Sequence, residues 1–377
     1  MSIVGIDASR AVSAAPTGTE AYATHLIRRI VAELDVAHAI RLYFREAPPA
    51  FLSDGTSNWR RVENRIISFP RLWTHVRLSW EMLLRPPDLL FVPSHVLPLL
   101  RPRRTLVTVH DLGYLAFPEA HPAGQRRYLD WSTRWNVHAA THVLADSVAT
   151  RDAIVEAYGV ASAKITVVYP GYDADLAPVR DGGILQRVRA RYGIRGDYIL
   201  FIGRIQPRKN LRRLIEAFAQ IAGDHPGLTL ILAGPQGWFT EPIEARVRAL
   251  GLTERISFPG YVATEDKAAL ISGARLFAYP SLHEGFGFPA LEAQACGTPL
   301  LTSTTSSLPE VTGDGGVLVD PEQVDAIAGG LQRLLTDAEL RERLIARGFE
   351  NLRRFSWTKA ARQVCDIIEG LLSLPTS

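Results

Sequence analysis

The sequence predicts an α/β protein with two domains, each built on a parallel sheet. Short apolar runs alternate with amphipathic segments along the whole chain, which is typical of strands joined by crossover helices. The chain has 377 residues, 47% of them hydrophobic, and at about 150 residues per domain this exceeds one ordinary core. A stretch rich in proline, glycine and aspartate, PGYDADLAPVRDGG at residues 170–183, interrupts the alternation and marks the expected linker.

The first half of the chain contains apolar segments typical of strands, separated by stretches of helical periodicity. Strands are expected at residues 3–7, 40–44, 65–69, 88–92, 105–109 and 141–145. Residues 20–34 are expected to form a helix, because these apolar residues recur at helical spacing: Leu26, Ile27, Ile30, Val31 and Leu34. These elements define a first domain at residues 1–175.

The second half repeats the same scheme and defines a second domain at residues 176–355. Its strands are expected at 198–202, 228–233, 255–258 and 275–279, and its helices at 210–222, 241–250 and 265–273. Residues 356–377 are expected to form a C-terminal helix, and whether this helix crosses back onto the first domain stays open.

Composition excludes several classes of protein. The net charge is only +3 with 21% charged residues, so no nucleic-acid partner is expected. The two cysteines, Cys296 and Cys365, provide no disulfide framework. The opening MSIVGIDASR lacks the pattern of a signal peptide, and no apolar run has the length of a membrane span. A cytoplasmic protein is expected, soluble or peripheral on the inner face of the plasma membrane.

Residues just past the strands are the first candidates for a site, because ligands bind at the carboxyl ends of parallel strands. The strand ending in Asp7 leads through Pro16, Thr17 and Gly18 into a helix, whose amino terminus suits an anion. A steric need for glycine in a tight turn is the alternative. His110 and Asp111 follow the strand at 105–109, and the alternative for this histidine is a bond to a loop carbonyl.

A basic loop, GRIQPRKN at residues 203–210, follows the strand at 198–202. Arg204 offers a bidentate fork, Lys209 adds a point charge, and the helix that opens near Asn210 adds partial positive charge. Together with the turn at Gly203 they suit a diphosphate whose charge grows as it departs. A solvated basic loop is the alternative.

The segment PSLHEGFGFPALEAQACGTP at residues 280–299 carries the most information. Glu284 is expected in a loop and Glu292 on the first turn of a helix, where it would accept hydrogen bonds from two vicinal hydroxyls. Gly285 and Gly287 let a phosphate or a sugar ring approach the backbone.

Two glutamates separated by seven residues resemble the motif of the retaining glycosyltransferases of the GT-B fold, group 4. The segments GRIQPRKNLRRLIEAF, ISFPGYV and EGFGFPALEAQACGTPLLTSTTSSLPEVTGDGGVLVDP resemble this family closely over residues 198–322. The first half resembles it more loosely, through the Gly18 loop, VHDLG and ADSVATRDAIVEAYGV. The loop reads TGTEAY in place of the commoner glycine pair. The resemblance implies two Rossmann-like α/β/α domains facing across a central cleft.

The resemblance also implies roles for individual residues. Arg204 and Lys209 would bind the donor diphosphate, Glu292 the nucleotide ribose, and Glu284 the transferred sugar. His110 would lie beside that sugar and Gly18 near the distal phosphate. The remaining substrate-binding set would be Asp111, Gly203, Val262 in the turn beside the base, Gly285, Phe286 and Gly287.

The resemblance implies transfer of a hexose, mannose-like, from a nucleotide diphosphate sugar, GDP-sugar favoured, in surface polysaccharide or glycoconjugate assembly. The acceptor would be a glycan or a lipid-linked molecule. Attack and departure on one face would retain the anomeric configuration. No cofactor or metal is expected, on the interpretation that the chain offers neither an Asp-x-Asp pair nor a histidine and cysteine cluster at metal-binding spacing. A nucleotide-sugar epimerase, a phosphorylase and a two-lobed sugar-binding protein are the alternatives.

Residues 71–104 combine basic and aromatic side chains. They hold six arginines together with Trp73 and Trp80, against only Glu81 and Asp88. This combination is typical of a surface that rests on an anionic membrane. The alternative is packing in the core, because Trp73, Val76 and Trp80 have helical spacing.

Overall fold

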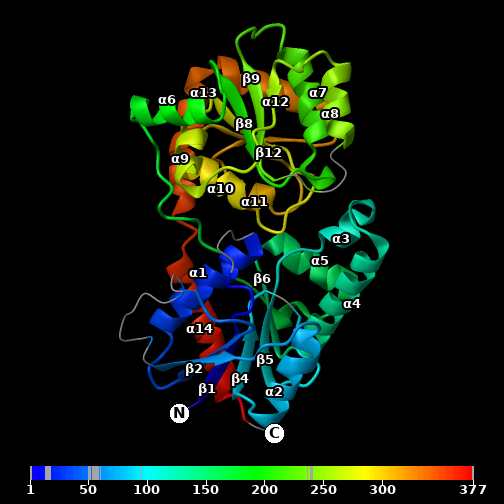
Figure 1. The fold of residues 1–377 in the computed structure, drawn as a ribbon, viewed down its shortest axis with the longest axis vertical. Helices are drawn as coiled ribbons and strands as arrows, with labels where there is room; N and C mark the ends of the chain where they lie inside the picture. The colour runs from blue at the N-terminus through cyan, green and yellow to red at the C-terminus, as the bar shows by residue number, and fades with distance from the viewer. Residues whose placement is uncertain are drawn as a thin grey trace. The chain divides into compact units, whose positions relative to one another are not determined.

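The computed structural model describes residues 2–12, 18–49, 52, 59, 61–94, 96–235, 237 and 241–375. The chain forms two compact α/β units, each on its own parallel sheet (Figure 1), which confirms the predicted fold class. One unit comprises residues 1–115, 121–171 and 355–377, and the other comprises 116–120 and 172–354. The expected boundaries were 175/176 and 355/356.

The sheet of the first unit has the order β3-β2-β1-β4-β5-β6-β7, and all pairings are parallel. Its strands are β1 (Ile3–Asp7), β2 (Ala39–Phe44), β3 (Val62–Ile66), β4 (Leu89–Val92), β5 (Arg104–Val109), β6 (His142–Ala145) and β7 (Ile165–Val167). Parallel strands buried on both faces need helices between them. These are α1 (Gly18–Glu33), η3 (Trp73–Leu78), α2 (Ser79–Leu84), α3 (Gly113–Ala116), η4 (Pro118–Ala120), α4 (Ala123–Ala139), α5 (Val148–Tyr158), η5 (Ser162–Lys164) and α14 (Trp357–Ser373).

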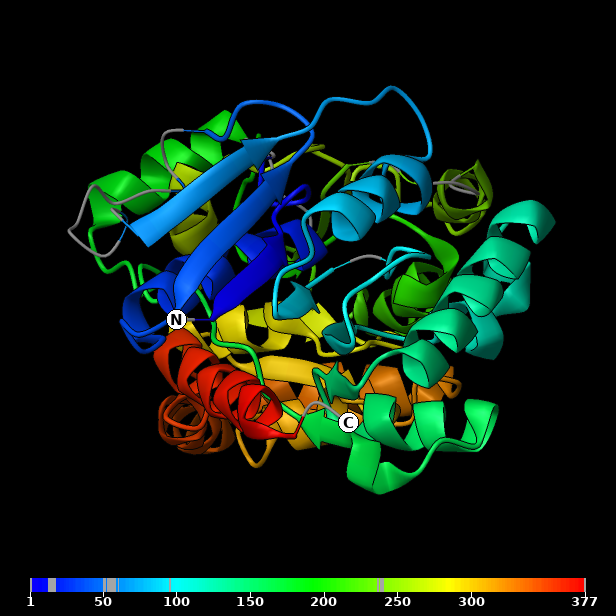
Figure 2. The same ribbon diagram turned by 90° about the horizontal axis from the view of Figure 1, so that it is seen from below.

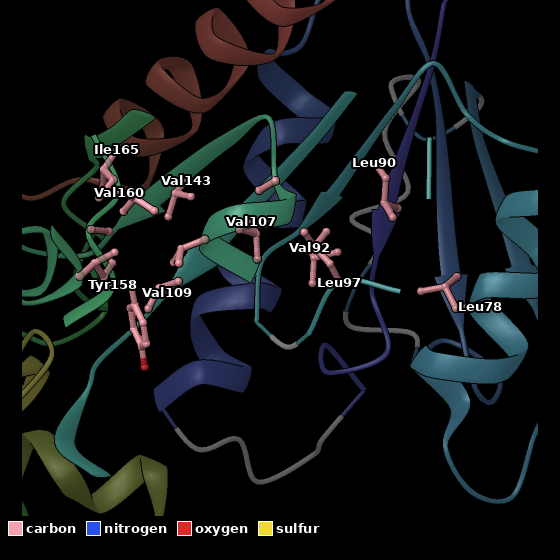
Figure 3. Packing of buried hydrophobic residues seen from close by; sticks show 14 of the residues in the cluster. Leu78, Leu90, Val92, Leu97, Val107, Val109, Val143, Tyr158, Val160 and Ile165 are labelled. Atoms are coloured by element: carbon pink, nitrogen blue, oxygen red, sulfur yellow. The ribbon is translucent and has the colours of Figure 1, made fainter. Parts of the chain in front are cut away.

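Aliphatic side chains from neighbouring strands form a core in the first unit (Figure 3). Leu90 and Val92 on β4, Val107 on β5 and Val143 on β6 lie in one buried cluster, joined by Leu78 of η3. Close packing of this cluster fixes the strand ends, where the candidate site residues lie.

The sheet of the second unit has the order β10-β9-β8-β11-β12-β13, again with parallel pairings. Its strands are β8 (Tyr198–Ile202), β9 (Thr229–Ala233), β10 (Ile256–Ser257), β11 (Leu276–Tyr279), β12 (Leu300–Ser303) and β13 (Val317–Val319). Its helices are α6 (Gly182–Arg191), η6 (Pro207–Lys209), α7 (Leu211–Ile221), α8 (Glu241–Ala249), α9 (Thr264–Ser272), α10 (Phe288–Ala295), α11 (Leu308–Thr312), α12 (Val324–Thr336) and α13 (Ala338–Leu352).

Two strands of the first sheet differ from the sequence-based expectation. The strand expected at 65–69 lies at 62–66, and the three-residue strand β7 was not predicted. Among the described strands, β3 and β7 are the two edges of this sheet, so each pairs with a neighbour on one side only. An edge strand needs little apolar periodicity, and β3 is largely polar and exposed.

The last helix belongs to the first unit, although the second unit precedes it in sequence. α14 packs against α1, and the two lie side by side in Figures 1 and 2, coloured red and blue. Trp357 opens α14 and stacks on His25 of α1 with ring centroids 5.1 Å apart. Gly171 lies so close to Trp357 that a Cβ added to Gly171 would be 2.2 Å from the backbone nitrogen of Trp357.

Candidate functional site

A buried ion pair lies at the carboxyl edge of the second sheet. Lys209 ends the single turn η6 that follows β8, and Glu284 lies in the loop after β11, the neighbouring strand. The Lys209 Nζ lies 2.5 Å from Glu284 Oε1. Both side chains are buried, so the structure brings together two residues that the sequence placed 75 positions apart.

Two further groups hold the same carboxylate. Arg208 donates to Glu284 Oε2 at 3.2 Å, and the Tyr279 hydroxyl donates to Oε1 at 2.9 Å. Burial opposes the charged form of Glu284, but Lys209 and Arg208 outweigh it and lower the pKa to about 2. Two cations therefore surround one carboxylate, which leaves net positive charge at this edge.

The backbone conformation of Asn210 explains how the basic loop is fixed. Asn210 adopts the left-handed conformation with φ of 61° between η6 and α7. Asparagine tolerates this conformation better than most residues. Its Nδ2 donates to the carbonyls of Pro280 and Pro321 at 3.1 and 2.6 Å. The amide thus ties the Lys209 turn to the Glu284 loop.

The turn at residues 284–287 is braced by the loop before α11. Ser307 Oγ donates to the carbonyls of Glu284 and Phe286 at 2.9 and 2.7 Å. Ser306 Oγ accepts from the Glu284 amide at 2.9 Å. Gly287 has φ of 106°, and a Cβ there would meet Leu308 at 2.7 Å. The turn therefore requires glycine, and Gly285 and Phe286 precede it in the same braced segment.

Glu292, eight residues after Glu284, forms a second ion pair. It lies on α10, and its Oε1 is 2.5 Å from Lys267 Nζ on α9. The expectation that Glu292 occupies the first helical turn is wrong, because α10 begins at Phe288 and Glu292 is in the second turn. Gly287, with its φ of 106°, is the residue before the helix, so α10 begins directly at Phe288 and Glu292 is its fifth residue. A carboxylate with one paired oxygen still has capacity to accept other donors.

Arg204, Gly203 and Val262 are further predicted residues of the second unit. Arg204 is exposed, and Arg208 is the arginine that bonds to Glu284 beside Lys209. Gly203 follows β8, and its carbonyl approaches within 2.0 Å of a Cβ built on Gly234. The Gly234 amide donates to Gly260 at 2.7 Å, which brings the turn containing buried Val262 to the end of β9.

In the first unit, His110 pairs with a residue that the sequence did not indicate. His110 follows β5, and its Nδ1 lies 2.6 Å from Oδ2 of Asp146, which follows the neighbouring strand β6. The ring of Tyr22 meets His110 edge-on at 4.8 Å. Burial lowers the pKa of His110, but the charge and hydrogen bond of Asp146 outweigh it and raise the pKa.

Asp111 and Gly18 occupy helix starts. Asp111 Oδ1 accepts from the Gly113 amide at 3.0 Å, at the beginning of α3. Gly18 is the first residue of α1 and is exposed, so the helix begins two residues before the expected start at Glu20. Pro16 and Thr17 lie outside the described residues.

Polar atoms line the carboxyl edge of four neighbouring strands of the first sheet. Within the described residues, five buried atoms there have no hydrogen-bond partner: Asp7 Oδ2, Ser9 Oγ, Ser94 Oγ, His110 Nε2 and Asp146 Oδ1. Unpaired buried polar atoms are costly and rare in folded proteins. A hollow of about 460 Å³ lies beyond β2 and β3 at the same edge, lined by Arg45, Glu46, Ser68, Phe69 and Pro70.

No group of three or more histidine, cysteine, aspartate or glutamate side chains in the described part of the chain is placed to hold a metal ion. The sequence contains one Asp-x-Asp pair, Asp173 and Asp175, which the expectation of metal independence overlooked. Asp173 accepts from the Asp175 amide at 3.1 Å. Metal independence stays a prediction.

Comparisons with known proteins agree with this architecture. Residues 16–176 match the family model "Glycosyltransferase Family 4", and residues 187–351 match "Glycosyl transferases group 1". The O-antigen chain mannosyltransferase B of Escherichia coli is 30% identical over 360 residues, covering 92% of this chain and 94% of that protein.

Solved structures share the fold. The sucrose-phosphate synthase of Thermosynechococcus elongatus superposes with a TM-score of 0.76 at 21% identity, over 99% of this chain and 100% of that one. Anabaena HepE, in complex with UDP and glucose, superposes with a TM-score of 0.73 at 20% identity, over 99% of this chain and 100% of that one. Two parallel α/β units, the family models over both halves and a relative spanning nearly the whole chain lead to one conclusion. The chain belongs to the GT-B glycosyltransferases of group 4 and is mannosyltransferase-like.

Proposed function

We propose that this glycosyltransferase moves mannose, or a similar hexose, from a GDP-sugar to a glycan or lipid-linked acceptor. Retention of the anomeric configuration, metal-independent transfer and a place in surface polysaccharide assembly are parts of the proposal. The sugar is supported by the name of the E. coli relative, a mannosyltransferase of O-antigen chains. UDP is the competing donor nucleotide, because HepE was crystallised with UDP and glucose.

The cluster of Lys209, Arg208 and Glu284 carries this proposal. A departing nucleoside diphosphate gains negative charge as the bond from sugar C1 to the phosphate oxygen breaks, and preorganised cations stabilise that charge. Glu284 keeps both cations ordered without cancelling their combined charge. We assign Lys209 and Arg204 to the diphosphate on the family resemblance, and we add Arg208 because of its position beside Lys209.

In the proposed reaction the acceptor oxygen attacks C1 on the face from which the phosphate departs. The bond from C1 to the acceptor oxygen forms, and the acceptor proton passes to the leaving phosphate oxygen. The sugar passes through an oxocarbenium-like state, so positive charge near the diphosphate contributes most of the catalysis from the second unit.

His110 is assigned to the transferred sugar on the same resemblance. Asp146 accepts from Nδ1 at 2.6 Å, which leaves Nε2 as the nitrogen for a substrate hydroxyl. A carboxylate in this arrangement fixes both the tautomer and the ring orientation of a histidine. Asp146 therefore acts as a positioning residue for His110.

Glu292 is assigned to the ribose of the donor and Glu284 to the transferred sugar. The Lys267 pair holds the Glu292 side chain in one orientation, which lowers the entropy lost when a ribose binds. Gly18, the turn at 285–287 and the Val262 turn complete the proposed donor contacts.

Calorimetric titration of the purified chain with GDP, UDP, dTDP and ADP in EDTA tests the donor. Selective binding of GDP is expected, and it is expected to persist in EDTA. Selective binding of UDP would overturn the GDP assignment and keep the transferase. If none of the four nucleotides binds, the donor site itself is wrong.

Product analysis tests the reaction class. With the preferred GDP-sugar and a mannoside acceptor, free nucleotide and an α-linked glycoside are expected. An isomerised donor would indicate an epimerase, and binding without turnover would indicate a sugar-binding protein.

A further inference from the structure

An apolar stripe runs along the outside of η3 and α2. The stripe consists of Leu72, Val76 and Trp80, four residues apart, and of Leu83 and Leu84, three and four residues after Trp80; between 48% and 66% of each side chain is exposed. The opposite face of the same helical segment carries Trp73, Leu78 and Met82, which are buried in the core of the first unit. The core-packing alternative is therefore correct for Trp73 and wrong for Val76 and Trp80.

The stripe continues onto two neighbouring segments. Ser79 Oγ of α2 accepts from the amides of Leu99 and Leu100 at 2.9 and 3.3 Å, and both leucine side chains are exposed. On the other side, His75 of η3 bonds to the Tyr128 hydroxyl of α4 at 3.0 Å and packs edge-on to Trp131. Tyr128 and Trp131 are also exposed.

We call these exposed side chains the apolar face: Leu72, Val76, Trp80, Leu83, Leu84, Leu99, Leu100, Tyr128 and Trp131. A monomeric protein rarely exposes a contiguous apolar area of this kind without using it. Aliphatic side chains form its centre, and tryptophan and tyrosine lie among them. This mixture suits the boundary between lipid acyl chains and headgroups.

The charges around the apolar face are almost all positive. The exposed arginines on the same segments are Arg71, Arg85, Arg103, Arg127 and Arg134. The carboxylates on these segments mostly have partners of their own. Glu81 is buried between Arg65 and Arg77, and Asp130 accepts from the Tyr158 hydroxyl. Asp88 is exposed, and its Oδ2 accepts from the Ile3 amide.

We propose that the apolar face docks the first unit peripherally on an anionic lipid bilayer. The aliphatic stripe enters the interface, and the surrounding arginines contact lipid phosphates, whose negative charge attracts basic side chains near such a surface. None of the described helices is long and apolar enough to cross a bilayer, so the contact is one of lying on the surface. The idea that a lipid-linked acceptor is used there depends on the proposed function. The docking on a bilayer does not depend on it.

A bilayer fits the apolar face better than another macromolecule would. A glycan needs convergent polar groups beside its stacking rings, and the centre of this face is aliphatic. A second copy of the chain would have to bury five or more like charges against each other, which is unfavourable. Anionic headgroups complement those charges.

Co-sedimentation of the full chain with vesicles tests the docking. At low salt the chain is expected to pellet with phosphatidylcholine vesicles that contain phosphatidylglycerol, and to stay in solution with phosphatidylcholine alone. The double variant Trp80→Ser/Leu83→Ser is expected to bind at least about tenfold more weakly, because two large apolar side chains no longer enter the interface. Both positions are more than half exposed, so folding is expected to persist, as thermal melting would check.

The matched control is Val36→Ser, which removes an apolar side chain that is 78% exposed outside the apolar face. It is expected to bind vesicles as the parent chain does. Failure of the parent chain to pellet with anionic vesicles at low salt would overturn the docking, as would equal binding by the double variant. Nucleotide calorimetry on the same samples is a separate readout, so loss of the donor site and loss of docking are distinguishable.

Discussion

Lys209 differs from the loop lysine that the sequence indicated, because its ammonium is buried against Glu284 and Tyr279. Lys209→Ala is expected to lower turnover by about two orders of magnitude or more, since one preorganised charge at the leaving group is worth that much. The measurement is kcat with saturating donor.

Loss of Lys209 also leaves Glu284 with fewer buried partners, so stability must be measured beside activity. The double variant Lys209→Ala/Glu284→Gln is expected to regain stability without regaining turnover. Lys359→Ala, which removes an exposed lysine of α14, is the control. Near-normal turnover in Lys209→Ala would remove this lysine from the diphosphate site.

Glu284 links the same cluster to acid stability. Its pKa is lowered from 4.5 to about 2, so the folded state binds its proton less readily than the unfolded state does. The resulting stabilisation is complete above the unfolded value and is lost as pH falls from about 5 towards 2. Urea unfolding across that range is expected to show a shallower acid loss in Glu284→Gln than in the parent chain. Parallel curves would contradict the shift.

Asp146 gives His110 a testable dependence on pH. The wild-type carboxylate raises the pKa of His110, so Asp146→Asn is expected to move the apparent pKa of kcat/KM to lower pH. A misoriented imidazole is also expected to lower kcat by about tenfold to a hundredfold. Asp146→Glu, which restores the charge, should recover part of the pH profile. An unchanged profile in Asp146→Asn would show that Asp146 has only a structural role.

The helices and strands themselves could largely be read from the sequence. Strands β1 and β8 have the predicted bounds, because a buried parallel strand is a continuous apolar run with clear ends. Edge strands β3 and β7 lack that signal. His110 and Lys209 could be chosen as candidates because each follows a predicted strand in the sequence. That criterion needs no knowledge of which strands are neighbours.

Partners across strands could not be predicted. Asp146 is 36 residues from His110, and its neighbour relation depends on the order β5-β6. The choice of Arg208 over Arg204 as the partner of Glu284 depends on the single turn η6, which orients each basic side chain differently. Asp146, directly past the strand at 142–145, and the doublet Arg208-Lys209 were the available signals, and neither determines a contact.

At the scale of elements, α14 depends on close backbone approach. Gly171→Val is expected to destabilise the first unit by about 1–3 kcal/mol or more, because its side chain would collide with Trp357. Thermal melting measures the effect. Gly182→Ala is the control, since an added Cβ there meets nothing within 4 Å. Equal melting temperatures in both variants would contradict this packing.

At the scale of the whole molecule, most of the proposed donor contacts, Lys209 among them, lie in the second unit. A nucleotide at about a hundred times its Kd stabilises the state that binds it by about 2.7 kcal/mol. Scanning calorimetry is therefore expected to show an upward shift with the preferred nucleotide, and no shift in Lys209→Ala. A shift that persists in the variant would locate nucleotide binding away from Lys209.

The return of α14 to the first unit has a consequence for synthesis on the ribosome. The second unit is nearly continuous in sequence, so it can complete its core as soon as residue 354 has emerged. The first unit begins earlier but must wait for residues 355–377, which cover apolar side chains of α1. Until residues 355–377 have left the ribosome, the amino-terminal half exposes that surface, and it is the half in greater need of a chaperone.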